Sequence, residues 1–226
     1  MNGRRTGDKK DEGLVIEERH FDCDYGLFRR PFGEEGRALL KDMNEHHRKL
    51  SEWGLSVLPP MRCEKILDIG CGGGMLISLL ADMFADSKIY GVDISEESVA
   101  LTKEVNAGIV NEGRCHVSMA SVSDLPFGDG SFDLVTAFET YFFWPDLGND
   151  IKEAVSKIKS GGYLIVVSEM YPHPDFNERN NEAARLTGLV LRENDVIADL
   201  IEGCGMDVSV HIVERNNWVA FVGKKR

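Results

Sequence analysis

A glycine-rich turn that follows a short apolar run is the feature that most constrains the fold of this chain. Residues 66–76 read Ile-Leu-Asp-Ile-Gly-Cys-Gly-Gly-Gly-Met-Leu. The apolar start is typical of a central strand that is buried on both faces. The glycines allow positive φ angles and a close approach of the backbone to a ligand, and the helix expected after them presents unpaired N–H groups to the turn. The stretch therefore predicts a ligand-binding turn at the end of a strand in an α/β sheet.

Asp68 distinguishes this turn from a loop that binds a dinucleotide. Gly70 and Gly72 fill the first two glycine places of the G-x-G-x-x-G pattern, but Met75 stands in the third. A fixed negative charge beside the turn would repel a pyrophosphate, whereas it suits a ligand that carries an ammonium or a sulfonium group. An oxidoreductase with a nicotinamide cofactor is therefore the weaker alternative. A glycine turn with an incidental aspartate is the other alternative.

A second carboxylate, Asp93, ends the next expected strand, at residues 88–93. It lies close to the distance of about 20 residues after the glycine turn at which an acidic residue holds ribose hydroxyls. The alternative role for Asp93 is a helix cap, because Ser95 and Glu96 begin the next helix. Taken together with Asp68, the ribose role is the better interpretation.

The pattern D-x-G-x-G-x-G from Asp68 to Gly74 resembles motif I of the class I S-adenosylmethionine-dependent methyltransferases of the small-molecule type. Residues 120–135 (ASVSDLPFGDGSFDLV) are similar to the family segment in which L-P-F precedes a strand that begins F-D-L-V. The resemblance covers about residues 64–224. It implies S-adenosylmethionine as cofactor, S-adenosylhomocysteine as product, and a doubly wound, Rossmann-like sheet. That sheet has seven strands with the last one antiparallel, helices on both faces, and an added N-terminal helix.

The resemblance also indicates which residues contact the cofactor. Relatives commonly have an aspartate at the position of Ser121, where it holds the adenine amino group; serine is a weaker acceptor. Val122 would meet the adenine ring through its main-chain N–H. Glu139, after the strand at 133–138, would meet the methionine end or the acceptor. The expected cofactor contacts are Asp68, Gly70, Cys71, Gly72, Asp93, Ile94, Ser121, Val122 and Glu139. We assign no catalytic base and no metal site.

The sequence says less about the acceptor of the methyl group than about the cofactor. Residues 141–144 (YFFW) are either an acceptor pocket or a hydrophobic plug. Residues 139–142 (ETYF) lack the prolines of the (D/N)-P-P-(F/Y) motif that methyltransferases acting on exocyclic or amide nitrogens often show after this strand, which disfavours methylation of such nitrogens. His46 and His47 could close over a ligand, although ordinary rim histidines are the favoured interpretation. His173 is a conceivable base, and a solvated loop histidine is again favoured. A small-molecule acceptor is expected, with a cofactor-binding module that has no activity of its own as an alternative.

Composition excludes several other classes. The 226 residues suffice for one sizeable domain with a small appendage, and the net charge of −12 makes nucleic acid an unexpected partner. Five scattered cysteines without a C-x-x-C pair favour neither disulfides nor zinc, as in a cytoplasmic protein. No apolar run reaches the roughly 20 residues that span a bilayer, and no secretory signal is expected because the N-terminal segment lacks an apolar core.

We expect three segments: a disordered tail at 1–13, an N-terminal helical extension at 14–60 and the cofactor-binding domain at 61–226. One helix should run from about 34 to 58 and end at Pro59-Pro60. In the domain, strands are expected at 64–69, 88–93, 115–119, 133–138, 163–169, 206–213 and 218–224. Helices are expected at 74–84, 96–110, 147–158 and 193–202. The helix after 147 should end at Ser160-Gly161-Gly162, and residues 170–192 should form a short polar insertion near the acceptor.

Overall fold

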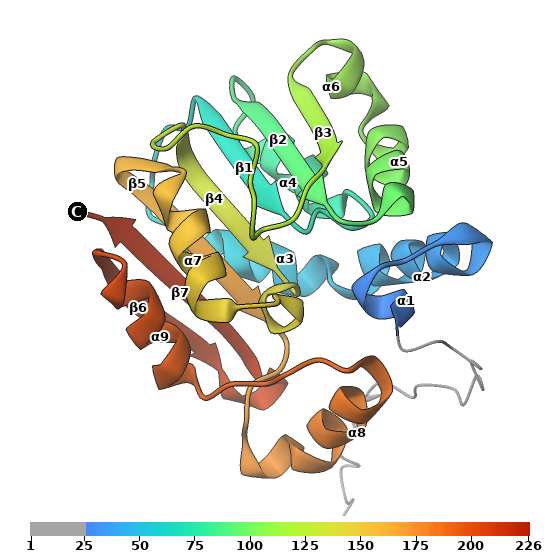
Figure 1. Cartoon of the computed structure of the whole chain (residues 1–226), viewed down its shortest axis with the longest axis vertical. Helices are drawn as coiled ribbons and strands as arrows, with labels where there is room; N and C mark the ends of the chain where they lie inside the picture. Colours follow the sequence, from blue (N-terminus) through green and yellow to red (C-terminus); the bar gives the residue numbers. More distant parts are fainter. Residues whose placement is uncertain (1–25) are drawn as a thin grey trace, which may run out of the picture.

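The computed structural model describes residues 26–226, so the expected tail at 1–13 and the first part of the extension lie outside the described residues. Its centre is a seven-stranded sheet with the order β3-β2-β1-β4-β5-β7-β6 (Figure 1). The strands are β1 (Lys65–Ile69), β2 (Lys88–Asp93), β3 (Cys115–Met119), β4 (Phe132–Phe138), β5 (Ile158–Ser168), β6 (Met206–Val213) and β7 (Trp218–Lys225). The first five pair in parallel, whereas β7 is antiparallel to both β5 and β6. The predicted seven-stranded sheet with its last strand antiparallel is therefore confirmed.

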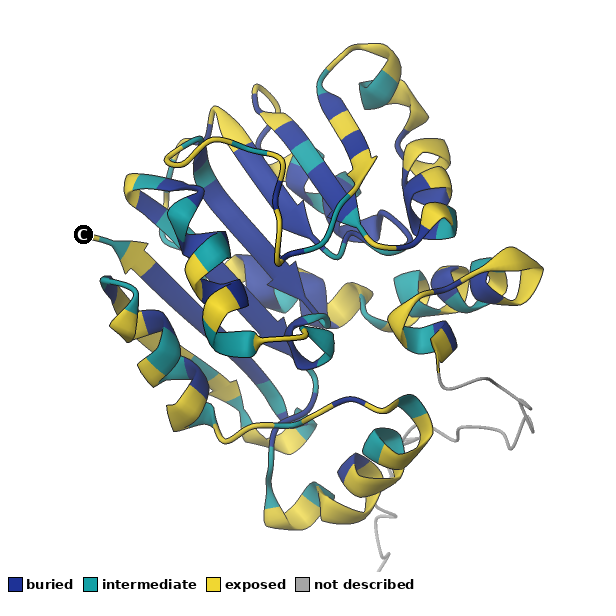
Figure 2. Cartoon of the chain, in the orientation of Figure 1, coloured by how far each residue is buried: buried dark blue, intermediate teal, exposed yellow. Residues whose placement is uncertain are grey.

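Helices cover both faces of the sheet. One face packs against α3 (Arg48–Ser56), α4 (Met75–Met83) and α5 (Glu96–Val105), and the other against α7 (Leu147–Ser156) and α9 (Asn194–Gly203). Each helix contributes an apolar stripe, such as Ile77 and Leu80 on α4 or Ile197 and Ile201 on α9, all almost fully buried. Figure 2 shows the result: the central strands are buried along their length, while the outer sides of the helices are exposed.

The remaining elements gather mainly beyond the carboxyl ends of the parallel strands. These are α1 (Gly26–Arg29), α2 (Gly33–His46) and α8 (Asn177–Thr187), with α1 in contact with both of the others (Figure 1). Three short 3₁₀ helices complete this part of the chain: η1 (Tyr141–Phe143), η2 (Pro174–Phe176) and η3 (Glu214–Asn216). A further short helix, α6 (Ala107–Asn111), follows α5. This placement matters because the carboxyl edge of an open α/β sheet is where ligands bind.

The long N-terminal helix expected at 34–58 is two helices, α2 and α3, which meet at His47. The hydrogen bonds continue through the junction, from His47 N–H to the Met43 carbonyl at 2.9 Å and from Ser51 N–H to the His47 carbonyl at 2.9 Å. The apolar stripe runs through both helices, so periodicity alone did not show the break. The helix expected at 96–110 is likewise divided at Asn106, into α5 and α6.

One further expectation was wrong. Ser160-Gly161-Gly162 does not end a helix: these residues lie in β5, which starts at Ile158 and has an irregular register opposite Phe132–Leu134. The polar insertion expected at 170–192 contains the helix α8, which was not predicted. Its only buried residue is Asn180, so it has no apolar stripe to show its period.

Candidate functional site

Two adjoining cavities open at the carboxyl edge of the sheet. Gly70, Gly72 and Glu139 line both of them. All nine residues expected to contact a cofactor line one cavity or the other. That they contact a cofactor stays a prediction, but the fold brings them to one place.

The main chain of the glycine turn is already hydrogen-bonded within the protein. The N–H groups of Gly70 and Cys71 donate to the Val92 carbonyl at 2.8 and 3.0 Å, and Gly72 N–H donates to Asp93 Oδ2 at 3.0 Å. Gly70 and Gly72 have φ angles of +76° and +52°, which glycine adopts without strain. A pyrophosphate loop needs such N–H groups free to bind the anion. This geometry therefore argues against a nicotinamide dinucleotide.

Asp68 presents a buried carboxylate oxygen next to this turn. Its Oδ1 accepts a hydrogen bond from Thr136 Oγ1 at 2.7 Å, whereas Oδ2 is buried and has no partner among the described residues. Burial raises the pKa of Asp68 to about 7, against the opposing effect of the Thr136 hydrogen bond. An unpaired buried acceptor is costly, so it marks a place where a ligand donor or cation fits.

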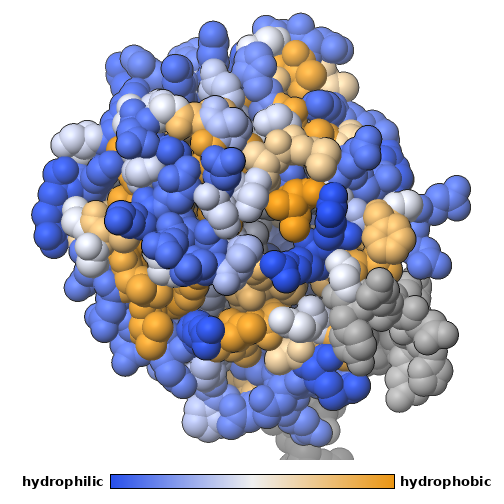
Figure 3. All heavy atoms as spheres, in the orientation of Figure 1, coloured by the Kyte–Doolittle hydropathy of each residue, from blue (hydrophilic) through white to orange (hydrophobic). Residues whose placement is uncertain are grey.

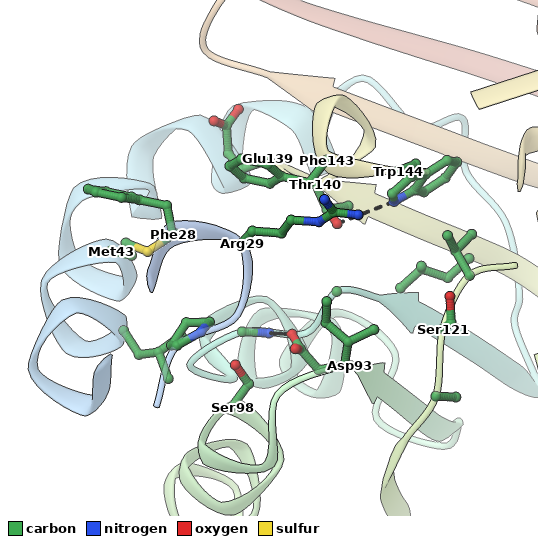
Figure 4. Close-up of a pocket in the computed structure, with 18 of the residues that line it drawn as sticks. Phe28, Arg29, Met43, Asp93, Ser98, Ser121, Glu139, Thr140, Phe143 and Trp144 are labelled. Carbon is green, nitrogen blue, oxygen red and sulfur yellow. Dashed lines mark hydrogen bonds between the residues drawn. The ribbon is translucent and has the colours of Figure 1, made fainter. Parts of the chain in front are cut away.

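Asp93 faces the larger cavity with a carboxylate that is held in place. Oδ2 accepts from Gly72 N–H, and Oδ1 accepts from Ser95 N–H at 2.9 Å. The cap of α5 is Ser95, whose Oγ accepts from Ser98 N–H at 3.1 Å. Burial raises the pKa of Asp93, and the main-chain hydrogen bonds oppose it. Ser95, and not Asp93, therefore caps α5. Asp93 is directed at the cavity (Figure 4).

The opposite wall of the larger cavity comes from the segment after β3. Ser121 and Val122 line it, with Ile94 from the segment after β2. Ser121 Oγ accepts a hydrogen bond from Ser123 N–H at 3.2 Å, so part of its acceptor capacity is used locally. Figure 4 shows Ser121 facing the cavity from a separate segment than Asp93. The two side chains thus line one cavity from two different segments of the chain.

The four aromatic residues after β4 divide into two pairs. Tyr141 and Phe142 are buried in the core, with 2% and 6% of their surface exposed, whereas Phe143 and Trp144 line the larger cavity. Trp144 Nε1 donates to Thr140 Oγ1 at 3.3 Å, which fixes the indole at the cavity wall (Figure 4). Tyr141 and Phe142 thus act as the hydrophobic plug, whereas an acceptor pocket at Phe143 and Trp144 stays a prediction.

Comparison with known proteins agrees with this geometry. Residues 67–166 match the family described as a methyltransferase domain. The chain carries a class I S-adenosylmethionine-dependent methyltransferase domain. S-adenosylmethionine is accordingly the cofactor of this domain.

Curated relatives of the methyltransferase domain act on varied acceptors. An O-methyltransferase of Penicillium expansum is 31% identical over 117 residues, which is 52% of this chain and 42% of the relative. A sterol 4-C-methyltransferase of Caenorhabditis elegans is 30% identical over 148 residues, 66% of this chain and 42% of the relative. The chain thus spans less than half the length of these two relatives.

Solved structures share the fold of the methyltransferase domain. A phosphoethanolamine N-methyltransferase of Haemonchus contortus in complex with S-adenosyl-L-methionine superposes with a TM-score of 0.73 and 16% identity, over 88% of this chain and 59% of that one. A SAM-dependent methyltransferase from Aquifex aeolicus superposes with a TM-score of 0.68 and 18% identity, over 84% of this chain and 98% of that one.

The helices α1 and α2, which precede the methyltransferase domain in the chain, close the cavities from the side opposite the sheet. Phe28 and Arg29 from α1 and Leu40 and Met43 from α2 line the larger one (Figure 4). Asn44 Nδ2 donates to the Gly73 carbonyl at 2.8 Å and so joins α2 to the glycine turn. These helices were expected to be an extension, and none of their residues was predicted as a cofactor contact. The apolar period of α2 was the available signal, but it did not show what the helix covers.

Glu139 lies between the two cavities in a strained conformation. Its φ angle of +56° is in the left-handed region, which is uncommon for a residue other than glycine and is often found at functional sites. Its N–H donates to the Val167 carbonyl at 3.0 Å, and its Oε1 accepts from Glu169 N–H at 2.5 Å. Burial raises the pKa of Glu139 well above its usual value, and the nearby Glu169 charge adds to this.

Glu169 also brings together the two adjacent histidines. His46 Nε2 lies 3.1 Å from Glu169 Oε2, and His47 Nε2 lies 3.6 Å from Glu169 Oε1. The hydrogen bond to Glu169 raises the pKa of His46, against the effect of burial. The expectation of ordinary rim histidines left this cluster out. The other histidine considered as a base, His173, accepts a hydrogen bond from Asp175 N–H at 3.2 Å and lines neither cavity.

Proposed function

We propose that this chain transfers a methyl group from S-adenosylmethionine to a small-molecule acceptor. The observation that supports it most is the buried, unpartnered Oδ2 of Asp68 beside a glycine turn whose own amides are bound internally. Such a site selects a ligand with positive charge, because it offers carboxylates where a nucleotide loop offers N–H donors.

Bound in these cavities, S-adenosylmethionine would supply a methyl group already activated by its sulfonium. In our proposal, Asp68 holds the ammonium at the methionine end, and Asp93 accepts hydrogen bonds from the ribose hydroxyls. Ser121 and the main chain at Val122 hold the adenine. This leaves the wall formed by Glu139, Phe143 and Trp144 for the acceptor. Placing the acceptor in line with the methyl group supplies much of the rate by proximity and orientation.

A small acceptor is supported by two features. The curated relatives include O-methyltransferases and a sterol 4-C-methyltransferase, and the net charge of −12 disfavours a polyanionic acceptor such as nucleic acid. Figure 3 shows apolar side chains interrupting the mainly hydrophilic surface on this face of the molecule, as expected where an organic acceptor approaches.

Calorimetric titration with S-adenosylhomocysteine tests the cofactor assignment. Asp68→Asn and Asp93→Asn should each weaken binding by about 10- to 100-fold, since a hydrogen bond to a charged group contributes about 1.5–3 kcal/mol. Asp86→Asn is the matched control, because Asp86 is exposed and lines neither cavity; it should bind as the wild type. Failure of the wild type to bind, or unchanged binding by both site variants, would overturn the proposal.

Transfer of a radioactive methyl group to a panel of small phenols, amines, thiols and carboxylic acids tests the activity. Methylation of any one acceptor by the wild type, with loss of transfer in Asp93→Asn, is the expected result. Binding of the cofactor without transfer to any member of a broad panel would favour the cofactor-binding module without activity.

A further inference from the structure

His46, His47 and Glu169 form a cluster of metal-ligating groups beside the cofactor cavities. Their ligand atoms all lie within 4.8 Å of one another. Neighbouring helical residues normally diverge by about 100° around the axis, yet both imidazoles direct Nε2 toward the same carboxylate, one to each oxygen. Their ring centroids lie 5.0 Å apart, with the rings inclined by 68°. The arrangement comes from the junction between α2 and α3, at which the two histidines lie.

We propose that these three side chains bind a divalent transition-metal ion. Two imidazole nitrogens and one carboxylate are a donor set suited to zinc, iron and similar ions, and they leave coordination positions open. Ligands at about 2.1 Å from such an ion lie at most about 4.2 Å apart. Small rotations of the side chains therefore suffice to bring all three ligands onto one ion.

An ordinary ion pair explains the cluster less well. One histidine would pair with Glu169, but the second imidazole, with only 16% of its side chain exposed, faces the same carboxylate. The charge of Arg179 also acts on Glu169 and His46. Its hydrogen bonds, however, go to the Glu169 main-chain carbonyl at 3.0 Å and to Asn180 Oδ1, and not to the Glu169 carboxylate. Glu169 thus presents its two carboxylate oxygens to the histidines.

The location connects this ion to the methyl-transfer site. His47 lines the smaller cavity together with Asp68, Gly72 and Glu139, and Glu169 N–H donates to Glu139 Oε1. Resting on the proposed function, we extend the assignment: the open coordination positions take water or an oxygen, nitrogen or sulfur atom of the acceptor. No metal site was expected from the sequence. His46 and Glu169 are 123 residues apart, so no ligand-spacing pattern could have connected them.

A metal titration tests the site. The full chain is first freed of metal with a chelator and then titrated with Co²⁺ and with Zn²⁺. Wild type should bind one equivalent of Co²⁺ with visible absorption bands, and Zn²⁺ should displace it. His47→Gln and Glu169→Gln should each lower the affinity at least tenfold. His116→Gln is the matched control: His116 lies on β3 with an exposed side chain, and this variant should bind as the wild type.

Far-UV circular dichroism and the thermal midpoint show whether each variant is folded, and His46→Gln gives a third independent removal of a ligand. Absence of one-equivalent binding by the wild type would overturn the proposal. So would wild-type affinity in folded His47→Gln and Glu169→Gln, which would place the ion elsewhere.

A second comparison separates this proposal from the proposed function. Asp93→Asn should bind S-adenosylhomocysteine more weakly, by about 10- to 100-fold, and keep the Co²⁺ spectrum, because Asp93 belongs to the ribose side of the site. If the wild type binds the cofactor but no metal, the metal site is wrong and the methyltransferase proposal stands. If the wild type binds metal but no cofactor, the metal site stands and the methyltransferase proposal is wrong.

Discussion

The unusual protonation of Asp68 gives cofactor binding a predictable dependence on pH. With a pKa raised to about 7, the free carboxyl group is increasingly protonated as the pH falls below 7, and a cationic ligand binds only the ionised form. The affinity for S-adenosylhomocysteine should therefore fall between pH 7 and 5.5, by up to about tenfold per pH unit. The ligand's own α-amino group stays protonated in this range, because a free amino-acid ammonium next to its carboxylate has a higher pKa than a peptide α-amino group.

Calorimetry across that range in wild type, Asp68→Asn and Asp86→Asn provides the measurement. Asp68→Asn should bind more weakly with a much flatter pH profile, and Asp86→Asn should follow the wild type. An equally steep profile in Asp68→Asn would assign the titration to another group.

Alanine substitutions at three glycines with positive φ distinguish three effects: backbone strain, steric overlap with neighbouring atoms, and loss of cofactor binding. A Cβ on Gly70 would lie 2.4 Å from Thr140 Oγ1, one on Gly72 would meet no atom closer than 3.8 Å, and one on Gly113 would have nothing within 4 Å. Gly113→Ala should cost only the left-handed strain, about 1–2 kcal/mol. Gly72→Ala should cost a similar amount but weaken cofactor binding, because its methyl group enters the cavity. Gly70→Ala should be the least stable of the three in urea unfolding.

Equal unfolding free energies for Gly70→Ala and Gly113→Ala would show that the turn relaxes around Thr140. Unchanged cofactor affinity in Gly72→Ala would show that the ligand does not approach this part of the backbone.

At the scale of elements, η1 and the residue that follows it perform two tasks. Phe142→Ala should destabilise the fold by about 3–5 kcal/mol, because it leaves a cavity in the core. Trp144→Phe should be tolerated by the fold, since Trp144 lies at the cavity wall and loses mainly its hydrogen bond to Thr140. Urea unfolding and S-adenosylhomocysteine titration of both variants check this division. Loss of stability by Trp144→Phe as large as that of Phe142→Ala would contradict it.

Elements were predictable where local pattern and burial coincide. The strands β2 and β3 were predicted to the residue, because each has apolar residues at its buried positions and is bounded by turn or cap residues. The start of β5 was missed, because Gly161 and Gly162 are typical of a helix end and only the pairing with β4 shows that they belong to a strand. The polar helix α8 was missed, because Asn180 is held by side-chain hydrogen bonds rather than by an apolar stripe.

The same distinction applies to the site. Asp68, Asp93 and the glycine turn were found because they lie within about 30 residues of one another in a motif with a physical basis. The walls formed by α1 and α2, and the convergence of His46, His47 and Glu169, depend on tertiary contacts between distant segments. No spacing rule in a single sequence carries that information.

For the whole molecule, cofactor binding should appear as a gain in stability. At a ligand concentration 100 times the dissociation constant, binding to the folded state alone adds about 2.7 kcal/mol. In a chain of this size that corresponds to an increase in the thermal midpoint of about 5–10 °C. Differential scanning fluorimetry with S-adenosylhomocysteine measures it, and Asp93→Asn should show a much smaller increase. An equal shift in Asp93→Asn would mean that the ligand stabilises the chain from another site.

Between residues 26 and 226, no helix is both long enough and apolar enough to cross a membrane. The surface of this region is mainly hydrophilic on the face that Figure 3 shows.

The internal hydrogen bonds of the glycine turn limit how the domain can be redesigned. Replacing Met75 with glycine would complete the letters of the dinucleotide pattern, yet it would free none of the amides that Val92 and Asp93 already hold. A change of cofactor would require rebuilding the end of β2 first, since that strand, and not the glycines, decides which groups the turn offers to a ligand.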